Sequence, residues 1–401
     1  MDRNTTKTMN LVQSLSTLHK VILRPFIFSL TLLIVAEPLA RSSEATGQEP
    51  SAQKAPASTE SRKSMQAAAQ LAQKSTSGSS AFSGQGSTST QNNSGKPHLR
   101  VGLALAGGGT RGCAHIGVIR ALEKAGIPID CIAGTSMGAI VGGLYASGRS
   151  TDDIQELILS KKLVHGYDTV PIPVRVALVP IFFLPHLFGY HPYDGLYRGG
   201  VFASFIRKSA PEGHREIENF RIPFAAIASN ILDGKAYPIK EGCIGKALQA
   251  SSAIPFLRRP VDIGDKLFID GGIVLNLPVE ETRNLGADFV IAVDVDDDLV
   301  NMQKKDFRKI GSVATRALNM HLSTIDAVQL QKADFVIHPD VTGIDLLSRK
   351  LKDARKAIKS GENETDKLLA ALKKKIEEQQ VSIADKHADK ATVKGEQIQN
   401  D

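Results

Sequence analysis

Short apolar runs alternate along this chain with stretches of helical periodicity, from residue 101 onward. A continuous apolar run of four to eight residues is typical of a strand covered on both faces, whereas apolar residues three and four apart indicate a helix. The predicted strands are residues 101–106, 131–133, 224–228, 236–239, 267–269, 289–294 and 335–338. The predicted helices are residues 113–125, 139–147, 152–163, 201–208, 245–251, 279–285 and 307–330. This alternation predicts an α/β fold of three layers, α/β/α, around a mostly parallel central sheet.

The first 97 residues have a different pattern. Residues 1–40 begin polar and basic and then contain a 12-residue apolar core at 25–36, which has the length of a signal-peptide core and is too short to span a bilayer. Pro38 stands where a small residue is wanted before cleavage at Ala40, so an uncleaved N-terminal membrane anchor is the alternative. We expect an exported protein, periplasmic or associated with an envelope membrane.

Residues 41–97 are rich in Ser, Gln, Ala and Gly, with Phe82 as their only aromatic residue. Such a composition cannot bury enough apolar surface to offset the entropy of ordering. It predicts a disordered linker, followed by a folded domain over residues 98–376.

The end of the chain is amphipathic and then polar. Residues 351–376 place apolar side chains at helical spacing with lysines on the other side, which predicts a helix with one solvated face. Residues 377–401 are polar, and we expect a disordered tail there.

One long apolar segment fits neither a regular helix nor a central strand. Residues 170–189 contain four prolines, and Arg175 is their only formal charge. A segment this apolar is either buried in the core or faces lipid. We interpret it as a flap beside the active site that touches the bilayer or an acyl chain.

The first predicted strand and helix are joined by Gly107, Gly108 and Gly109. Glycine leaves the backbone N–H groups unobstructed at the positive end of a helix, so this loop is suited to hold an anion. The glycines also fit a dinucleotide-binding motif. However, Cys113 stands where a Walker loop needs Lys, and Asp130 precedes the second strand instead of ending it.

The second predicted strand ends in Gly134-Thr-Ser136-Met-Gly138, a G-x-S-x-G sequence between a strand and a helix. This is the context of a nucleophile elbow, in which the two glycines bring strand and helix together and the serine hydroxyl projects beyond the sheet. A serine nucleophile needs donors for the oxyanion of its tetrahedral intermediate, and the N–H groups of residues 107–109 supply them one β-α unit upstream. The two motifs therefore predict a serine hydrolase.

These motifs resemble those of the patatin-like phospholipases, especially the bacterial members. The resemblance covers about residues 98–376 and continues in Ser251-Ser-Ala-Ile-Pro255 and in the Asp270-Gly-Gly box. It implies a lipid acyl hydrolase of phospholipase or lysophospholipase type, with a catalytic dyad of Ser136 and Asp270 and with no cofactor. Arg111 belongs to the anion loop in this pattern, where it either braces the turn or aids the oxyanion hole.

Two alternatives remain open. A Ser-Asp-His triad of α/β-hydrolase type could be completed by His321 or His338, both of which follow Asp270 in the chain. A domain that has lost catalysis and acts as an envelope lipid-binding scaffold is the other alternative, although both Ser136 and Asp270 are present.

Composition narrows the expected partners. The chain has 401 residues, a formal net charge of +7 and no tryptophan, and it lacks the basic blocks with interleaved aromatic residues that nucleic-acid binding requires. We expect a membrane lipid as substrate, a membrane surface as partner and no nucleic acid. The three cysteines are scattered, and Asp294, Asp296, Asp297 and Asp298 lack the EF-hand pattern, so no metal is expected.

Overall fold

The computed structural model describes residues 99–160, 162–167, 193–297, 302–308 and 311–398, and side chains in the last helix as far as 383. The described residues belong to the compact unit Lys96–Asp401. The predicted signal peptide, the linker and the apolar segment 170–189 lie outside them. Within the described part of the chain, no helix is both long enough and apolar enough to cross a membrane.

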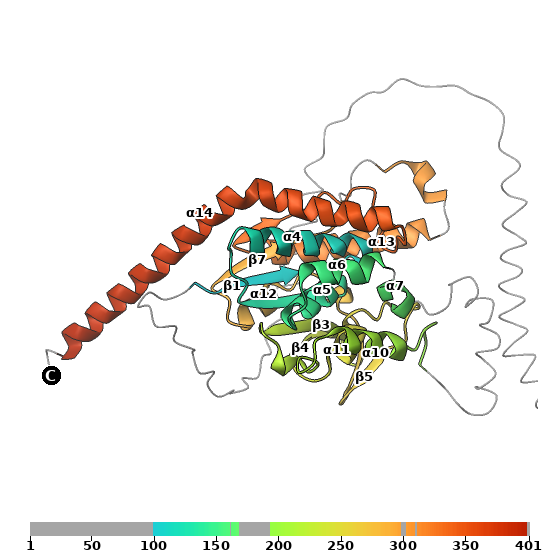
Figure 1. The fold of residues 1–401 in the computed structure, drawn as a ribbon, viewed down its shortest axis with the longest axis horizontal. Helices are drawn as coiled ribbons and strands as arrows, with labels where there is room; N and C mark the ends of the chain where they lie inside the picture. The colour runs from blue at the N-terminus through green and yellow to red at the C-terminus, as the bar shows by residue number, and fades with distance from the viewer. Residues whose placement is uncertain (1–98, 161, 168–192, 298–301, 309–310, 399–401) are drawn as a thin grey trace, which may run out of the picture. The chain divides into compact units, whose positions relative to one another are not determined.

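The core is a mixed sheet whose strand order is β5-β6-β3-β2-β1-β7-β8, with β4 paired to β3 (Figure 1). Strands β3, β2, β1, β7 and β8 are parallel, whereas β3 pairs antiparallel with β4 and β6, and β6 with β5. The strands are β1 Val101–Leu105, β2 Cys131–Thr135, β3 Phe224–Asn230, β4 Lys235–Ile239, β5 Val261–Ile263, β6 Lys266–Asp270, β7 Phe289–Val293 and β8 Phe335–Ile337. The fold is α/β with a mostly parallel central sheet, as the sequence predicts.

Helices follow most of the strands. They are α4 Ala114–Lys124, α5 Met137–Ala146, α6 Thr151–Leu159, α7 Lys162–Tyr167, α10 Gly200–Ser209, α11 Ile244–Ser251, α12 Val279–Asn284, α13 Ser312–Leu330 and α14 Leu351–Ile398. The 3₁₀ helices are η3 Gly109–Cys113, η5 Ile217–Asn219, η6 Gly271–Ile273 and η7 Lys304–Arg308.

Strand alternation shows how the helices form two layers. Successive side chains of a strand point to opposite faces, so Gly102 and Leu105 of β1 lie on opposite faces of the sheet. A Cβ on Gly102 would meet Thr282 of α12, whereas Leu105 lies against Gly142 of α5. Helices α5 and α12 therefore cover opposite faces, and the domain has the three predicted layers. The four strands β1, β2, β3 and β7 are fully buried because both faces are covered.

Helix α14 packs along α4 on the outside of the domain (Figure 1). Glycines allow this close approach: a Cβ on Gly117 would lie 2.0 Å from the carbonyl oxygen of Ile358, and one on Gly361 would lie 2.1 Å from that of Ala114. The helix continues to Ile398, so the expectation of disorder beyond residue 377 is wrong for 377–398. The Glu, Lys, Gln and Ala residues there favour helix, and polarity argues only against packing.

One predicted helix is divided. The helix expected over residues 307–330 appears as η7 and α13, and Gly311 has the left-handed φ of 85° immediately before α13. The apolar periodicity continues across this point, but the backbone of Gly311 is not helical, so periodicity alone cannot detect the break.

Candidate active site

The turn after β2 holds Ser136 in a backbone conformation that is rare for a residue with a side chain, with φ 49° and ψ −114°. Two glycines make this turn possible. A Cβ on Gly134 would lie 2.6 Å from the carbonyl oxygen of Gly138, and one on Gly138 would lie 2.3 Å from that of Leu105. A strand-to-helix turn this tight is the geometry of a nucleophile elbow.

Ser136 is held by contacts from two other elements. Its side chain lies beside the carboxylate of Asp270, and the serine hydroxyl lowers the pKa of that carboxyl. Its backbone N–H donates to Oγ of Ser251, at the end of α11, over 3.0 Å. The sequence indicated Ser251 only as part of a shared box and gave it no role. The structure adds it as a residue that fixes the backbone of the elbow.

The sheet register brings Asp270 to Ser136. Strand β3 lies between β2 and β6, with Thr135 opposite Ile227 and Asp270 opposite Ala228. The serine that follows Thr135 and the last residue of β6 therefore reach the same level on either side of β3. A Cβ on Gly271 would lie 2.3 Å from the carbonyl oxygen of Ile227, so the chain can turn away from β3 there only with glycine.

Asp270 is buried and retains a polar partner. Its Oδ1 accepts a hydrogen bond from the N–H of Gly272 over 2.9 Å. Burial raises the pKa of Asp270 to about 6, and the hydrogen bonds from Gly272 and Ser136 oppose this rise. A carboxylate with such a pKa is suited to accept a proton near neutral pH, because its affinity for the proton is higher than that of an exposed aspartate.

The glycine loop contributes fewer free donors than its sequence predicts. The N–H of Gly107 donates to Oδ1 of Asn276 over 3.0 Å, so this group is not available to an oxyanion. The N–H groups of Gly108 and Gly109 have no acceptor among the described residues. Gly109 also lines the cavity that contains Ser136. The expected donor set of residues 107–109 is therefore reduced to Gly108 and Gly109.

Arg111 does not face the cavity as an oxyanion donor. Its buried guanidinium is engaged by protein partners: Nε donates to the carbonyl of Ile344 over 2.7 Å, and the two terminal nitrogens contact Asn319 and Asp297 at 3.4 and 3.2 Å. Burial lowers its pKa, which nearby aspartates oppose. The side chain braces the glycine loop against the segment around Ile344, which is the first of the two roles expected for it, and these contacts do not place it in the oxyanion hole.

The histidines of the alternative triad have other partners. Nε2 of His321 hydrogen bonds to the carbonyl of Ile273 over 2.9 Å, and Nδ1 of His338 to Asp294 over 3.0 Å. His338 directly follows β8, three strands away from β2, which corresponds to about 14 Å at the usual strand spacing of about 4.8 Å. Asp270, in contrast, lies beside Ser136, whose hydroxyl lowers its pKa.

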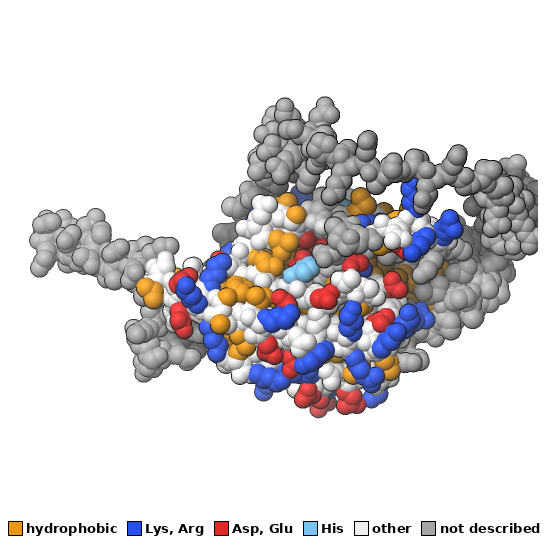
Figure 2. All heavy atoms as spheres, turned by 90° about the horizontal axis from the view of Figure 1, so that it is seen from above, with side chains coloured by type: hydrophobic (Ala, Val, Ile, Leu, Met, Phe, Trp, Pro, Cys, Tyr) orange, Lys and Arg blue, Asp and Glu red, His pale blue; other side chains and the backbone are white. Residues whose placement is uncertain are grey.

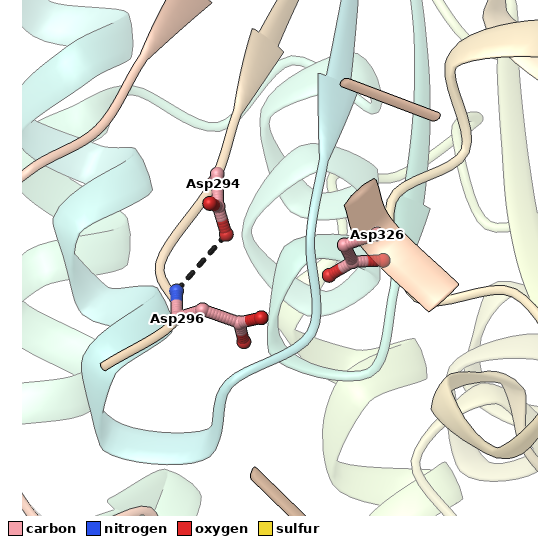
Figure 3. Close-up of side chains that lie close together, drawn as sticks. All are labelled: Asp294, Asp296 and Asp326. Atoms are coloured by element: carbon pink, nitrogen blue, oxygen red, sulfur yellow. Dashed lines mark hydrogen bonds between the residues drawn. The ribbon is translucent and has the colours of Figure 1, made fainter. Parts of the chain in front are cut away.

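Two aspartates that follow β7 and one of α13 form an acidic cluster (Figure 3). Carboxylate oxygens of Asp294, Asp296 and Asp326 lie within 4.8 Å of one another, and these are the described residues that could hold a metal ion. Burial, together with the neighbouring aspartates, raises the pKa of Asp296 to about 7 and that of Asp326 to about 8. Proton uptake and the nearby Arg111 thus offset the crowded negative charge. The sequence pointed to the first two residues, but Asp326 joins them from α13.

A cavity of about 130 Å³ contains Ser136. Apolar side chains from α5, α7, α10 and the segment after α11 form most of its walls, namely Met137, Ile140, Leu163, Phe202, Ile254 and Leu257. The opposite wall is the segment 346–349, which precedes α14. Thr110 of the glycine loop holds this segment, because its N–H donates to the carbonyl of Leu346 over 2.8 Å and its hydroxyl to that of Ser348 over 2.7 Å. No motif in the sequence indicated this wall.

Comparison with known proteins finds likenesses over part of the chain. Residues 103–283 match the family described as Patatin-like phospholipase. Lysophospholipase nte1 of Emericella nidulans is 35% identical over 195 residues, which are 49% of this chain and 12% of that protein. Patatin-like phospholipase domain-containing protein 6 of Homo sapiens is 32% identical over 199 residues, which are 49% of this chain and 13% of that protein. The chain thus spans only 12–13% of the length of these relatives.

Among solved structures, VipD from Legionella pneumophila matches 69% of this chain and 67% of its own, with a TM-score of 0.39 and 15% sequence identity. The two curated relatives named above come from organisms that are not bacteria, so the expected likeness to bacterial members in particular is not confirmed.

Proposed function

We propose that the chain, whose residues 103–283 match the patatin-like phospholipase family, is a lipid acyl hydrolase of phospholipase or lysophospholipase type. The observation that carries the proposal is the placement of Ser136 beside the buried carboxylate of Asp270, whose pKa the serine hydroxyl lowers, at the register of β2, β3 and β6. The nucleophile and the base lie beside each other, at a backbone strained into a nucleophile elbow and beside an apolar cavity.

The proposed reaction is acyl transfer to water. Oγ of Ser136 attacks the carbonyl carbon of the ester as Asp270 takes the hydroxyl proton, and the N–H groups of Gly108 and Gly109 donate to the oxyanion. Collapse of the intermediate expels the alcohol, which receives the proton from Asp270. Water then attacks the acyl-serine and gives its proton to Asp270. Collapse of this second intermediate releases the fatty acid, and Oγ of Ser136 takes the proton back from Asp270, which regenerates both residues.

The cavity supports a fatty acyl chain as the group that is transferred. Its walls are mainly aliphatic and aromatic side chains, including Ile140, Phe202 and Leu257. Ser136 lines the same cavity. Apolar walls with a few polar groups at one end are typical of a site that binds an apolar ligand in one orientation.

A membrane surface is the proposed partner, because the substrate resides there. Phe256 is 82% exposed and has a φ of 65°, a left-handed conformation that is strained for phenylalanine. Its neighbours Ile254 and Leu257 line the cavity, so Phe256 stands at the rim. An aromatic side chain held outward beside an acyl site is suited to insert into a bilayer. The segment 170–189, for which we expect a similar role, lies outside the described residues.

Charge supports contact with lipid over contact with nucleic acid. Figure 2 shows Lys and Arg side chains interspersed with Asp and Glu on the face in view, without a continuous basic area. Nucleic-acid binding is expected to need a basic stripe or patch, whereas a mixed surface with apolar residues at the rim is compatible with a lipid interface.

Product analysis tests the proposed activity. The full chain is incubated with lysophosphatidylcholine, phosphatidylcholine and a triacylglycerol, and released fatty acid is measured by mass spectrometry, with Ser136→Ala as the control. We expect release that requires Ser136, and labelling of Ser136 by a fluorophosphonate probe. A protein that releases no fatty acid and does not react with the probe would instead be the lipid-binding scaffold.

We also propose that the protein is exported, to the periplasm or an envelope membrane. This rests on the basic start and the 12-residue apolar core at residues 25–36. Cell fractionation tests it, with the expected result that the protein lies outside the cytoplasm or on an outward-facing membrane. A soluble cytoplasmic pool that keeps its first residues would reject this.

A further inference from the structure

Asn276 connects the segment after Asp270 with the glycine loop. Its side-chain Oδ1 accepts a hydrogen bond from the N–H of Gly107 over 3.0 Å, and its Nδ2 donates to Oδ2 of Asp326 over 2.6 Å. Asn276 is 1% exposed, so water does not compete for these bonds. One amide thus links the loop after β1 to helix α13.

Asp326 determines which way this amide faces. It is 1% exposed, and its two carboxylate oxygens accept from two donors, Nδ2 of Asn276 and the N–H of Leu277, the second over 2.9 Å. An amide reversed at Asn276 would place its oxygen against Asp326 and its NH2 group against the N–H of Gly107. With Asp326 ionised both contacts would be lost, and the N–H of Gly107 can only donate, so the two partners together hold the carbonyl oxygen of Asn276 toward Gly107.

The same amide is in contact with both halves of the site. A Cβ on Gly107 would lie 2.5 Å from Oδ1 of Asn276 and 3.3 Å from Cβ of Ser136, so the loop lies directly against both side chains. A Cβ on Gly272, whose N–H binds Asp270, would lie 3.1 Å from the same Oδ1. The position of the loop relative to the serine and the aspartate therefore depends on this one side chain.

We propose that Asp326 and Asn276 are positioning residues for the oxyanion loop: Asp326 orients the Asn276 amide, which draws the N–H of Gly107 away from the cavity. This leaves the N–H groups of Gly108 and Gly109 facing the acyl carbonyl. The inference rests on the proposed hydrolase function. Neither residue touches the substrate in this scheme, and their effect is transmitted through the backbone of Gly107.

An exchange of the two side-chain types tests the proposal. Asp326→Asn removes one of the two acceptor oxygens at position 326, and Asn276→Asp places two carboxylates in contact. Each change alone therefore breaks the hydrogen-bonded link between Asp326, Asn276 and Gly107. In the double variant, the amide introduced at position 326 accepts from Leu277 and donates to the carboxylate introduced at position 276. That carboxylate still accepts from Gly107, so every hydrogen bond is restored with the charge unchanged. Asp366→Asn, the same change at an exposed aspartate of α14, is the matched control.

We expect each single change to lower kcat for a soluble acyl ester by about 100-fold while KM changes little, because the defect is in loop position and not in substrate binding. The double variant and the control should turn over at close to the wild-type rate. The N–H of Gly107 also lies 3.4 Å from the backbone carbonyl oxygen of Asn276, so amide hydrogen exchange by NMR should find Gly107 strongly protected in the wild-type and double variant and less protected in the single variants. A single variant with unchanged kcat, or a folded double variant as impaired as the single ones, would overturn the proposal.

Amide hydrogen exchange at Gly107 also tests the positioning role of Asp326 and Asn276 separately from the hydrolase function. If the wild-type protein hydrolyses no acyl ester and ignores the fluorophosphonate probe, the hydrolase function fails, while the pattern of protection still tests the connection. If the single variants do not fold, recovery of folding in the double variant supports the connection. A wild-type Gly107 amide that exchanges as fast as an exposed loop amide contradicts it.

Discussion

Ser136 and Asp270 are the two residues that react in the proposed chemistry, and a substitution at either one removes a different catalytic group. Ser136→Ala removes the nucleophile and Asp270→Asn removes the base, so each should lower kcat by about 10,000-fold or more. His321→Ala should retain most of the activity, because the imidazole bonds to the carbonyl of Ile273. Steady-state kinetics on a soluble ester measure all three. A loss in folded His321→Ala equal to that in Asp270→Asn would restore the triad.

The pH dependence of turnover follows from the ionisation of Asp270. Burial raises its pKa to about 6, and only the ionised carboxylate can accept the proton of Ser136. We therefore expect kcat/KM to fall as the pH drops through about 6 and to level off above it. A histidine base would give a similar curve, so the profile is repeated with His321→Ala, which should keep the same acid limb. Loss of that limb in the variant would assign it to the histidine.

Phe256 is expected to contribute to membrane binding at a cost to stability. Glycine adopts the left-handed φ of 65° freely, so Phe256→Gly relieves the strain at this position. Glycine also loses more chain entropy on folding, which limits the expected gain in the free energy of unfolding to about 1 kcal/mol. The same change removes the exposed ring, so binding to phospholipid vesicles should weaken while hydrolysis of a soluble ester stays constant. Vesicle co-sedimentation and urea unfolding measure the two effects. Unchanged vesicle binding would remove Phe256 from the proposed interface.

Individual site residues were predictable where a local motif encodes them. The elbow around Ser136 and the turn after Asp270 depend on neighbouring glycines, which can be read from the sequence. Asn276 and Asp326 were not predicted as site residues, because their roles depend on contacts between segments 50 residues apart in sequence. Likewise, the sequence could not show that Gly107 uses its N–H within the protein.

At the scale of elements, the contact between α4 and α14 depends on the absence of side chains. Gly117→Ala would place a methyl group 2.0 Å from the carbonyl oxygen of Ile358, and backbone cannot yield as a flexible side chain can. We expect a loss of about 1–3 kcal/mol in the free energy of unfolding. Gly200→Ala, where a Cβ meets open space at the start of α10, is the matched control and should stay within about 0.5 kcal/mol. Equal urea midpoints for the two variants would contradict this.

Element prediction succeeded where hydrophobic periodicity decides the structure. All buried parallel strands coincide with apolar runs, because coverage on both faces removes polar positions. It failed at Gly311, where one residue interrupts an otherwise continuous helical pattern, and beyond residue 377, where a polar sequence forms a helix without needing a buried face. The bounds of an element depend on backbone conformation, which periodicity does not report.

The whole domain should lose stability as the pH rises. The folded-state pKa values of Asp270, Asp296 and Asp326 are raised from 3.8 to about 6, 7 and 8, chiefly by burial. Because these pKa values are higher in the folded state, the folded protein binds protons more tightly than the unfolded chain. The resulting stabilisation is complete below about pH 4, where both states are protonated, and is lost as the pH rises to about 8. Thermal unfolding should therefore give a lower Tm at pH 9 than at pH 5. Asp296→Asn should reduce the difference, and a Tm that rises over this range would contradict the argument.

For the molecule as a whole, the sequence predicts the fold class and the two catalytic motifs but not how the cavity is enclosed. The three layers follow from the alternation of strands and helices, and Ser136 and the glycine loop meet because both follow adjacent parallel strands. The wall at residues 346–349 has no periodic pattern and no motif, and it reaches the site through hydrogen bonds to a loop more than 230 residues earlier.

That distance along the chain has a consequence for the order in which the protein is made. A ribosome completes Ser136 and Asp270 well before it reaches the carbonyl groups of Ile344 and Ser348, which hold Arg111 and Thr110 of the glycine loop. On the proposed chemistry, a nascent chain therefore carries its nucleophile and base but lacks the support that fixes the oxyanion donors. Such a chain is a poor hydrolase until the segment that contains Ile344 and Ser348 has emerged and docked. The fold thus delays full activity against lipids until synthesis of the domain is nearly finished.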